Sequence, residues 1–339
     1  MTKHRYKIFL IAAAGLLIFD LVAAVYLYFD FSSFIKSPFI PNAPEKTITL
    51  LPGQGLKTIA GRLENEEIIS NRLYFSLFAK LKKAGKKLQA GEYLLSASKS
   101  PEEILDILVK GRVKLYRITL PEGLTIREVG ALVEKENFCS REQFTTLCRH
   151  PLLMAKLGIS APSLEGYLFP DTYFFPKQTA CEDIIAAMTG RFNAVFTEER
   201  RQRAKELGFS VHEILTLASI IEKETGEASE RPLISSVFHN RLKKNMRLES
   251  DPTVIYGIED FDGNIKKNHL QTLTPYNTYQ ITGLPPGPIA NPGALSLEAA
   301  LYPATTPYLF FVSKNDSTHY FSESFEEHKK AVIKYQLKR

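Results

Sequence analysis

The sequence predicts an α+β protein with three parts: an N-terminal single transmembrane helix, a small α+β module and a larger α+β domain. Three observations lead to this prediction. One apolar run near the N-terminus is long enough to cross a bilayer. A strand–turn–helix pattern occurs twice, 70 residues apart. The 339 residues, 44% hydrophobic and 24% charged, have an ordinary globular composition, with length for about two domains beyond an anchor.

The apolar run covers residues 8–29 and predicts a transmembrane helix. At about 1.5 Å per residue it spans a hydrocarbon core of about 30 Å, and Asp20 is its only charge. Three basic side chains lie in residues 1–7, so the positive-inside rule puts this end in the cytoplasm and everything after residue 30 outside. A cleaved signal peptide is the alternative, disfavoured by the length of the run and the lack of a clear cleavage site. Asp20 either contacts a partner helix or is tolerated by water defects.

Charge and cysteine content exclude several function classes. The net charge of +6 is spread through a mixed-sign chain, whereas nucleic-acid binders concentrate positive charge, so we expect no nucleic-acid partner. Cys139, Cys148 and Cys181 are too few for a disulfide scaffold or a zinc site. We expect buried thiols, with a Cys139–Cys148 bridge as the alternative. The histidines have no metal-ligand spacing and no phosphate-binding glycine motif occurs, so we expect no metal and no cofactor.

The part after the apolar run divides into a linker, a module and a domain. Residues 30–45 are rich in proline and serine, which predicts an extended tether. Residues 46–115 have the pattern of a compact α+β module, and residues 116–339 that of one larger α+β domain. The expected elements are strands at 47–50, 91–95 and 118–120, and helices at about 74–83, 101–110, 182–208, 211–225 and 230–243.

The module and the domain begin with the same pattern. Residues 118–140 align without gaps to 48–70, so that Ile59 matches Val129 and Glu64 matches Glu134. Two copies are too few for a solenoid. Because strand–Pro-Gly–helix units are common, the pattern alone leaves true duplication open.

The predicted helix 211–225 is the most informative segment for chemistry. At about 100° per residue its apolar side chains fill one arc; Glu222 falls inside this arc, and Glu224 lies at its edge. A carboxyl aimed into an apolar surface has a raised pKa, in the direction that suits a general acid. The alternative is a structural Glu222 that pairs with an arginine such as Arg231 or Arg241.

The segments after this helix are rich in amides, hydroxyls, aromatics and Gly/Pro turns. HNRL (239–242), MRLESDPTVIYG (246–257) and TPYNTYQITGLPPGPIANPG (274–293) show no hydrophobic period. Asn and Asp can bond sugar hydroxyls, and Tyr can pack on sugar rings. These segments therefore predict sugar-binding loops, with a purely structural loop set as the alternative.

Several strings, in this order, resemble the YceG-like, MltG-type endolytic murein transglycosylases: EGYLFPDTY, ASIIEKET, ASER, HNRL, MRLESDPTVIYG and YNTYQITGLPPGPIANPG. The resemblance runs from about residue 46 to the C-terminus. It implies that residues 46–115 are a LysM-like glycan-binding module and that residues 116–339 are the catalytic domain. It places the family's catalytic glutamate, in the motif ASI-[IV]-E-K-E, on Glu222.

The resemblance implies a membrane-anchored peptidoglycan lytic transglycosylase that needs no cofactor. Such an enzyme cuts the β-1,4 bond between N-acetylmuramic acid and N-acetylglucosamine in nascent strands, leaves 1,6-anhydro ends, and terminates or trims strand elongation. The implied partners are peptidoglycan strands and peptidoglycan synthases (penicillin-binding proteins). With the predicted anchor, the catalytic domain would lie outside the cytoplasmic membrane, in the periplasm or extracytoplasmic space.

This mechanism assigns the proton transfers to Glu222, so Glu222→Gln is predicted to abolish cutting. We expect Asp251 and Thr253 to hold the loop or a sugar hydroxyl. Other substrate-binding or supporting residues are expected at Glu224, Asn240, Arg241, Tyr256, Tyr276, Asn277 and Tyr279, with Tyr167 and Asp171 in a wall of the cleft. The alternatives are a hydrolase that uses Asp251 or Glu224 as its second carboxylate, and a non-catalytic wall-binding scaffold.

Overall fold

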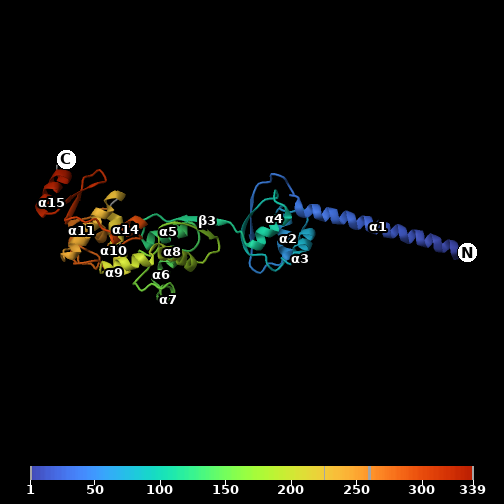
Figure 1. Cartoon of the computed structure of the whole chain (residues 1–339), viewed down its shortest axis with the longest axis horizontal. Helices are drawn as coiled ribbons and strands as arrows, with labels where there is room; N and C mark the ends of the chain where they lie inside the picture. Colours follow the sequence, from blue (N-terminus) through green and yellow to red (C-terminus); the bar gives the residue numbers. More distant parts are fainter. Residues whose placement is uncertain (1, 225, 259–260, 338–339) are drawn as a thin grey trace. The chain divides into compact units, whose positions relative to one another are not determined.

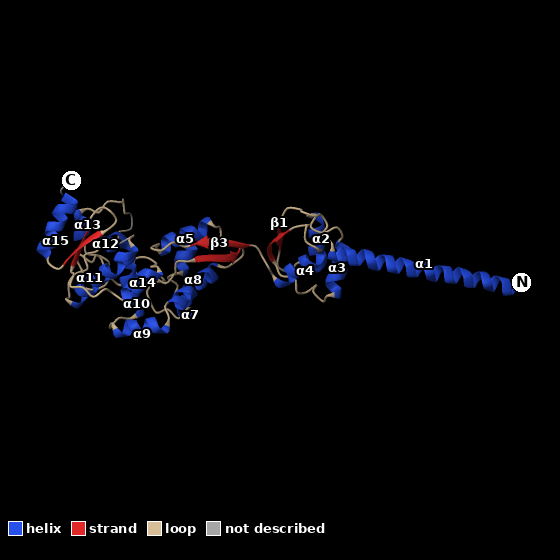
Figure 2. Ribbon diagram, turned by 45° about the horizontal axis from the view of Figure 1, so that its top comes forward, coloured by secondary structure: helices blue, strands red, loops and turns tan. Residues whose placement is uncertain are grey.

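The computed structural model describes residues 2–224, 226–258 and 261–337. The chain forms two compact units. Unit 1 runs to Tyr116 and includes Pro176–Gln178, whereas unit 2 comprises Arg117–Phe175 and continues from Thr179. In these described residues, the mixture of helices with three short two-stranded sheets confirms the predicted α+β class (Figure 1; Figure 2).

The N-terminal helix α1 (Thr2–Lys36) contains the whole predicted membrane span. It is long and apolar enough to cross a bilayer from Tyr6 onward, by length and composition. The helix does not stop at Phe29, however: residues 30–36, which we expected in an extended tether, are helical. Phe31, Phe34 and Ile35 pack against the core of unit 1, which explains why the helix continues there.

Unit 1 beyond α1 is a strand–helix–helix–strand–helix module. Its elements are β1 (Lys46–Leu50), α2 (Leu56–Asn65), α3 (Arg72–Leu81), β2 (Gly91–Leu95) and α4 (Pro101–Lys110). β1 and β2 pair antiparallel, with Ile48 opposite Tyr93. Ser100 caps α4 through a capping box, and Gly111 ends it with a left-handed backbone, which agrees with the predicted bounds 101–110.

The first part of unit 2 has the same order of elements. It contains β3 (Leu115–Thr119), α5 (Ile126–Lys135), α6 (Arg141–Leu147), α7 (Pro151–Lys156), β4 (Thr172–Pro176) and α8 (Cys181–Val195), and β3 pairs with β4. The bounds of α2 and α5 differ by 70 at both ends, the offset of the sequence pattern. The second copy differs by the added helix α7 and by a longer final helix.

The second part of unit 2 surrounds the helix that carries the candidate glutamates. Its elements are α9 (Glu198–Glu206), α10 (Val211–Glu224), η1 (Ala228–Glu230), α11 (Arg231–Lys243), α12 (Asp251–Tyr256), α13 (Lys267–Gln271), α14 (Ala294–Leu301), β5 (Phe310–Ser313), β6 (His319–Ser322), α15 (Phe325–Val332) and η2 (Ile333–Leu337). Every residue of α10 from Ile214 to Ile221 is buried, and α10 packs on α9, α11, α12 and α14. β5 and β6 are antiparallel, with Phe311 opposite Phe321.

The expected single helix 182–208 is wrong, because two helices occupy this stretch. α8 ends at Val195, and the side chain of Thr197 caps α9 by accepting a hydrogen bond from the Arg200 backbone. A Thr side chain that can cap a new helix favours such a break.

The cysteine prediction also needs correction. Cys139 and Cys181 form a disulfide between the loop before α6 and the first residue of α8. Cys148 is free and buried, and burial raises the pKa of its thiol. Sequence spacing could not find this pair, since its members are 42 positions apart and only the packing of α6 on α8 brings them together.

The disulfide predicts the thiol count of the protein. Alkylation in denaturant without reductant should label one cysteine per chain, Cys148, and alkylation after reduction should label all three. Intact-mass spectrometry measures both numbers. Three labelled cysteines without reductant, in protein prepared without reducing agents, would show that the bridge does not form.

Candidate active site

The two glutamates at the end of α10 have different surroundings. Glu222 is buried, with 6% of its side chain exposed. Its Oε1 lies 3.3 Å from Nη2 of Arg231, and its Oε2 accepts the Gly293 backbone N–H at 2.9 Å. Gly293 is the N-cap of α14, where the helix dipole favours a negative charge. Glu222 therefore ties α10 to α11 and α14, a contact that the structural alternative raised from the sequence also expects.

Glu224 lines an open cavity instead. The hydroxyl of Ser250 donates a hydrogen bond to its Oε1, whereas its Oε2 has no hydrogen-bond partner in the described part of the chain. Burial raises the pKa of Glu224 to about 7, and the charge of Asp251 adds to this rise. The Ser250 hydroxyl and Arg241 oppose it. A carboxyl half protonated near neutral pH, beside a cavity, is suited to proton transfer.

The cavity beside Glu224 has a volume of about 370 Å³. Four residues expected from the sequence to act on substrate meet here: Glu224, Arg241, Asp251 and Tyr279. Residues from the C-terminal strands and helix also line the cavity, among them Phe311, His319 and His328. Acidic, basic and aromatic groups therefore converge on one concave site.

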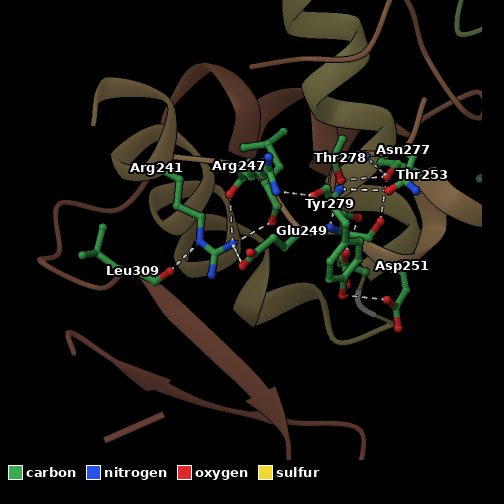
Figure 3. Close-up of polar contacts among 12 residues, drawn as sticks. Arg241, Arg247, Glu249, Asp251, Thr253, Asn277, Thr278, Tyr279 and Leu309 are labelled. Carbon is green, nitrogen blue, oxygen red and sulfur yellow. Dashed lines mark hydrogen bonds and ion pairs between the residues drawn. The ribbon is translucent and has the colours of Figure 1, made fainter. Parts of the chain in front are cut away.

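Two of these residues are held by hydrogen bonds that orient them toward the cavity. The Tyr279 hydroxyl donates to Oδ1 of Asp251 at 2.8 Å (Figure 3). Arg241 donates to the carbonyl of Leu309 at 2.7 Å and pairs with Glu249 at 3.0 Å (Figure 3). Arg241 thereby joins α11 to the residue just before β5, so the wall of the cavity depends on contacts far apart in the sequence.

Three other predicted residues hold loops in place. Thr253 is fully buried and shares a 2.8 Å hydrogen bond with Thr278 (Figure 3). The Asn277 amide donates to the carbonyls of His269, Leu270 and Thr272. Asn240 donates to the carbonyls of Thr306 and Tyr308. The polar groups of these side chains already form hydrogen bonds within the protein, so the structure does not place them as sugar contacts.

The remaining predicted residues lie away from the Glu224 cavity. Tyr256 donates to Glu165 at 3.1 Å, and its ring lies 4.8 Å from that of Tyr276. The Tyr167 hydroxyl is 3.0 Å from Nδ1 of His212. Asp171 pairs with Arg191 at 2.6 Å. Neither Tyr167 nor Asp171 lines the cavity, so the structure does not place them in its wall.

Sequence reasoning missed His319 and His328. His319 pairs with Glu230 at 2.7 Å, and Nδ1 of His328 is buried without a partner among the described residues. Burial lowers the pKa of His328, which favours its neutral form. Both lie in the last 21 residues of the chain, where no motif or spacing linked them to α10.

In the described part of the chain, no group of three or more His, Cys, Asp or Glu side chains could hold a metal ion. The absence of a metal and of a cofactor stays a prediction.

The YceG-like family model matches residues 48–334. An endolytic murein transglycosylase of Bacillus subtilis is 36% identical over 304 residues, which cover 85% of this chain and 84% of that protein. An endolytic murein transglycosylase of Streptococcus pneumoniae is 28% identical; the match covers 91% of this chain and 62% of that longer protein.

A solved structure is also similar. The crystal structure of a yceG-like protein of Listeria monocytogenes superposes with a TM-score of 0.59 at 34% identity, over 84% of this chain and 98% of that one. Its agreement, like that of the family model, extends over both units. The chain therefore belongs to the YceG-like family.

Proposed function

We propose that this chain is a peptidoglycan lytic transglycosylase whose acid–base group is Glu224. The observation that carries the assignment is a carboxyl with a pKa of about 7 that lines a cavity together with Asp251, Tyr279 and Arg241. The names of the relatives in Bacillus and Streptococcus support the substrate class. The family motif places the catalytic glutamate on Glu222, and that assignment stays the alternative; we favour Glu224 because Arg231 and Gly293 engage the carboxylate of Glu222.

The reaction needs one carboxyl that acts twice. Protonated Glu224 gives its proton to the glycosidic oxygen as the bond from C1 of the muramic acid to this oxygen breaks. The C6 hydroxyl of the same sugar then bonds to C1, and the Glu224 carboxylate takes the hydroxyl proton. The products are a free 4-hydroxyl and a 1,6-anhydro ring, no water is consumed, and Glu224 ends protonated as it began.

Asp251, Tyr279 and Arg241 would prepare Glu224 and the sugar. The Asp251 charge raises the pKa of Glu224, so that more of it is in the acid form at neutral pH. The same charge would stabilise the oxocarbenium-like transition state. Tyr279 fixes the Asp251 carboxylate, and the long side chain of Arg241, held by Leu309 and Glu249, bounds the site.

A peptidoglycan hydrolase is the second candidate, because Asp251 lies in the same cavity as Glu224 and could serve as a second carboxylate. The products distinguish the two. Digestion of purified peptidoglycan by the full-length protein in detergent, followed by mass spectrometry, should give ends lighter by one water than hydrolysed ends. Reducing ends would establish the hydrolase, and no products would favour the scaffold.

The raised pKa of Glu224 predicts the pH dependence of cutting. The first step requires the protonated acid, so kcat/KM should fall as the pH rises above about 7. Asp251→Asn removes a charge that raises the pKa of Glu224. The decline of kcat/KM in this variant should therefore begin at a lower pH than in the wild type. A pH–rate profile measures both.

Glu165 provides the control, since burial raises its pKa to about 7 as well. Glu165→Gln should leave the alkaline decline in place. If the alkaline decline of kcat/KM disappears in Glu165→Gln and stays at the same pH in Asp251→Asn, the group whose titration causes it is Glu165.

The anchor and the module complete the proposal. α1 would cross the cytoplasmic membrane once, with its N-terminus in the cytoplasm and both units outside. The module of unit 1, within residues 46–115, would bind glycan strands in a LysM-like manner, and peptidoglycan synthases would be partners during strand elongation. Labelling of single cysteines placed at residue 3 and at the exposed residue 86 with an impermeant reagent tests the orientation: only the second should react in intact cells.

A further inference from the structure

A second cavity of unit 2, with a volume of about 740 Å³, lies among α5, α10 and α12. The side chains that matter for its chemistry are Arg127, Arg149, Glu165, Lys223, Ile255 and Tyr256. It is larger than the Glu224 cavity and has no part in the proton transfers described above.

The two cavities are neighbours along the chain at two points. Lys223 lines the second cavity and Glu224 lines the first; Asp251 lines the first and Pro252 lines the second. Successive α-carbons are about 3.8 Å apart. The C-terminal end of α10 and the N-terminal end of α12 therefore each contribute residues to both cavities.

Three basic side chains line the second cavity: Arg127, Arg149 and Lys223. Arg127 and Arg149 are exposed, and neither side chain makes a hydrogen bond or an ion pair with any residue that the structure describes. Lys223 donates to the carbonyl of Gly123 at 3.3 Å, which leaves its charge without a counter-ion. Exposed guanidinium groups that have no ion-pair partner in the described protein are suited to bidentate contact with the carboxylates of a ligand.

The carboxylates in the same wall are already engaged. Glu128 accepts the N–H and hydroxyl of Thr125 at the start of α5, both at 2.8 Å. Glu165 is 5% exposed and accepts the Ile126 N–H at 3.0 Å and the Tyr256 hydroxyl at 3.1 Å. Arg127, Arg149 and Lys223 outnumber these two carboxylates, so the cavity lining carries an excess of basic side chains.

The opposite wall is apolar. Pro252, Ile255 and Ile258 are half-buried and line the cavity on the side of α12. An extended peptide with carboxylates fits such a combination better than a sugar does, because sugars are neutral and rely on amides and aromatic faces.

We propose that this cavity binds the stem peptide of the muramic acid residue at the cut. The inference rests on the proposed function. The stem is attached at C3 of the sugar, two ring bonds from the reacting C1. Its carboxylates would bind Arg127 and Arg149 while its backbone packs on Ile255. A stem of up to five residues reaches about 16–18 Å when extended. The enzyme would thus distinguish strands that carry stems from strands whose stems have been removed.

Two substrates test this proposal: intact strands, and strands stripped of stems by an amidase. With full-length protein in detergent, kcat/KM for intact strands should exceed that for stripped strands about tenfold or more. In Arg127→Gln/Arg149→Gln the value for intact strands should fall to that for stripped strands, which should itself be unchanged. Arg117→Gln/Lys135→Gln, which removes the same charge from exposed positions outside the cavity, should behave as the wild type.

Equal loss on both substrates, or no loss on either, would overturn the stem-peptide site. Titration of an isolated stem tetrapeptide into the Glu224→Gln protein separates this result from a failure of the proposed function. Peptide binding that is weakened tenfold by the paired arginine substitutions supports the site even if no substrate is cut. Binding that these substitutions leave unchanged rejects it even if anhydro ends are formed.

Discussion

Glu224→Gln is expected to reduce the formation of anhydro ends by about 10²- to 10⁴-fold, the usual contribution of a general acid–base group. Gln has the same shape and can still accept the Ser250 hydroxyl, but it cannot give a proton to the leaving oxygen. The measurement is the initial rate of anhydro-muropeptide release from purified peptidoglycan, with full-length protein in detergent.

Glu222→Gln is the matched control, two positions earlier on the same helix. Assayed at a temperature at which it is folded, it should retain activity within about tenfold of the wild type, because Glu222 contacts Arg231 and Gly293 and does not line the Glu224 cavity. The opposite pattern, an inactive but folded Glu222→Gln and an active Glu224→Gln, would restore the assignment made from the sequence motif.

The same control should be costly for stability. Removing the negative charge of Glu222 takes from the Arg231 guanidinium, itself 8% exposed, its ion-pair partner among the described residues. Breaking a buried ion pair in this way costs about 3–5 kcal/mol. That is a large part of the roughly 5–15 kcal/mol that stabilises a typical domain. Urea unfolding at pH 7 should therefore show a clearly lower midpoint for Glu222→Gln than for Glu224→Gln.

A double variant tests the cause of this loss. Glu222→Gln/Arg231→Met removes the stranded charge and keeps an acceptor for the Gly293 N–H, so it should recover much of the lost stability. Arg231→Met alone should be destabilised, since it strands the Glu222 carboxylate. An unchanged midpoint in all three proteins would mean that the pair does not contribute to folding.

The helical period predicted correctly that Glu222 points into the protein. It could not show what the side chain meets there, because the period gives a direction on one helix and the partner belongs to another. Arg231 lies on α11 and Gly293 at the start of α14, and only packing brings them to Glu222. Glu224, at the edge of the apolar arc, meets the cavity because α12 and the C-terminal strands close over it.

Local signals set the elements that the sequence predicted well. α4 has a capping box at Ser100 and a left-handed Gly111, so both of its ends are marked by nearby residues. The loop residues were harder to interpret. Asn277 and Thr253 have the polar side chains expected of a sugar site, yet the same groups satisfy loop carbonyls and hydroxyls. Composition cannot distinguish these two uses of a polar group.

The continuation of α1 to Lys36 has a practical consequence for any soluble version of the protein. Removal of residues 1–39 would take away the whole anchor and also Phe31, Phe34 and Ile35, which cover the hydrophobic core of unit 1. Tyr74 would lose the 2.8 Å hydrogen bond that it donates to Asp30. A truncation that begins at Asp30 would keep this cover, whereas one that begins at residue 40 exposes apolar side chains and invites aggregation.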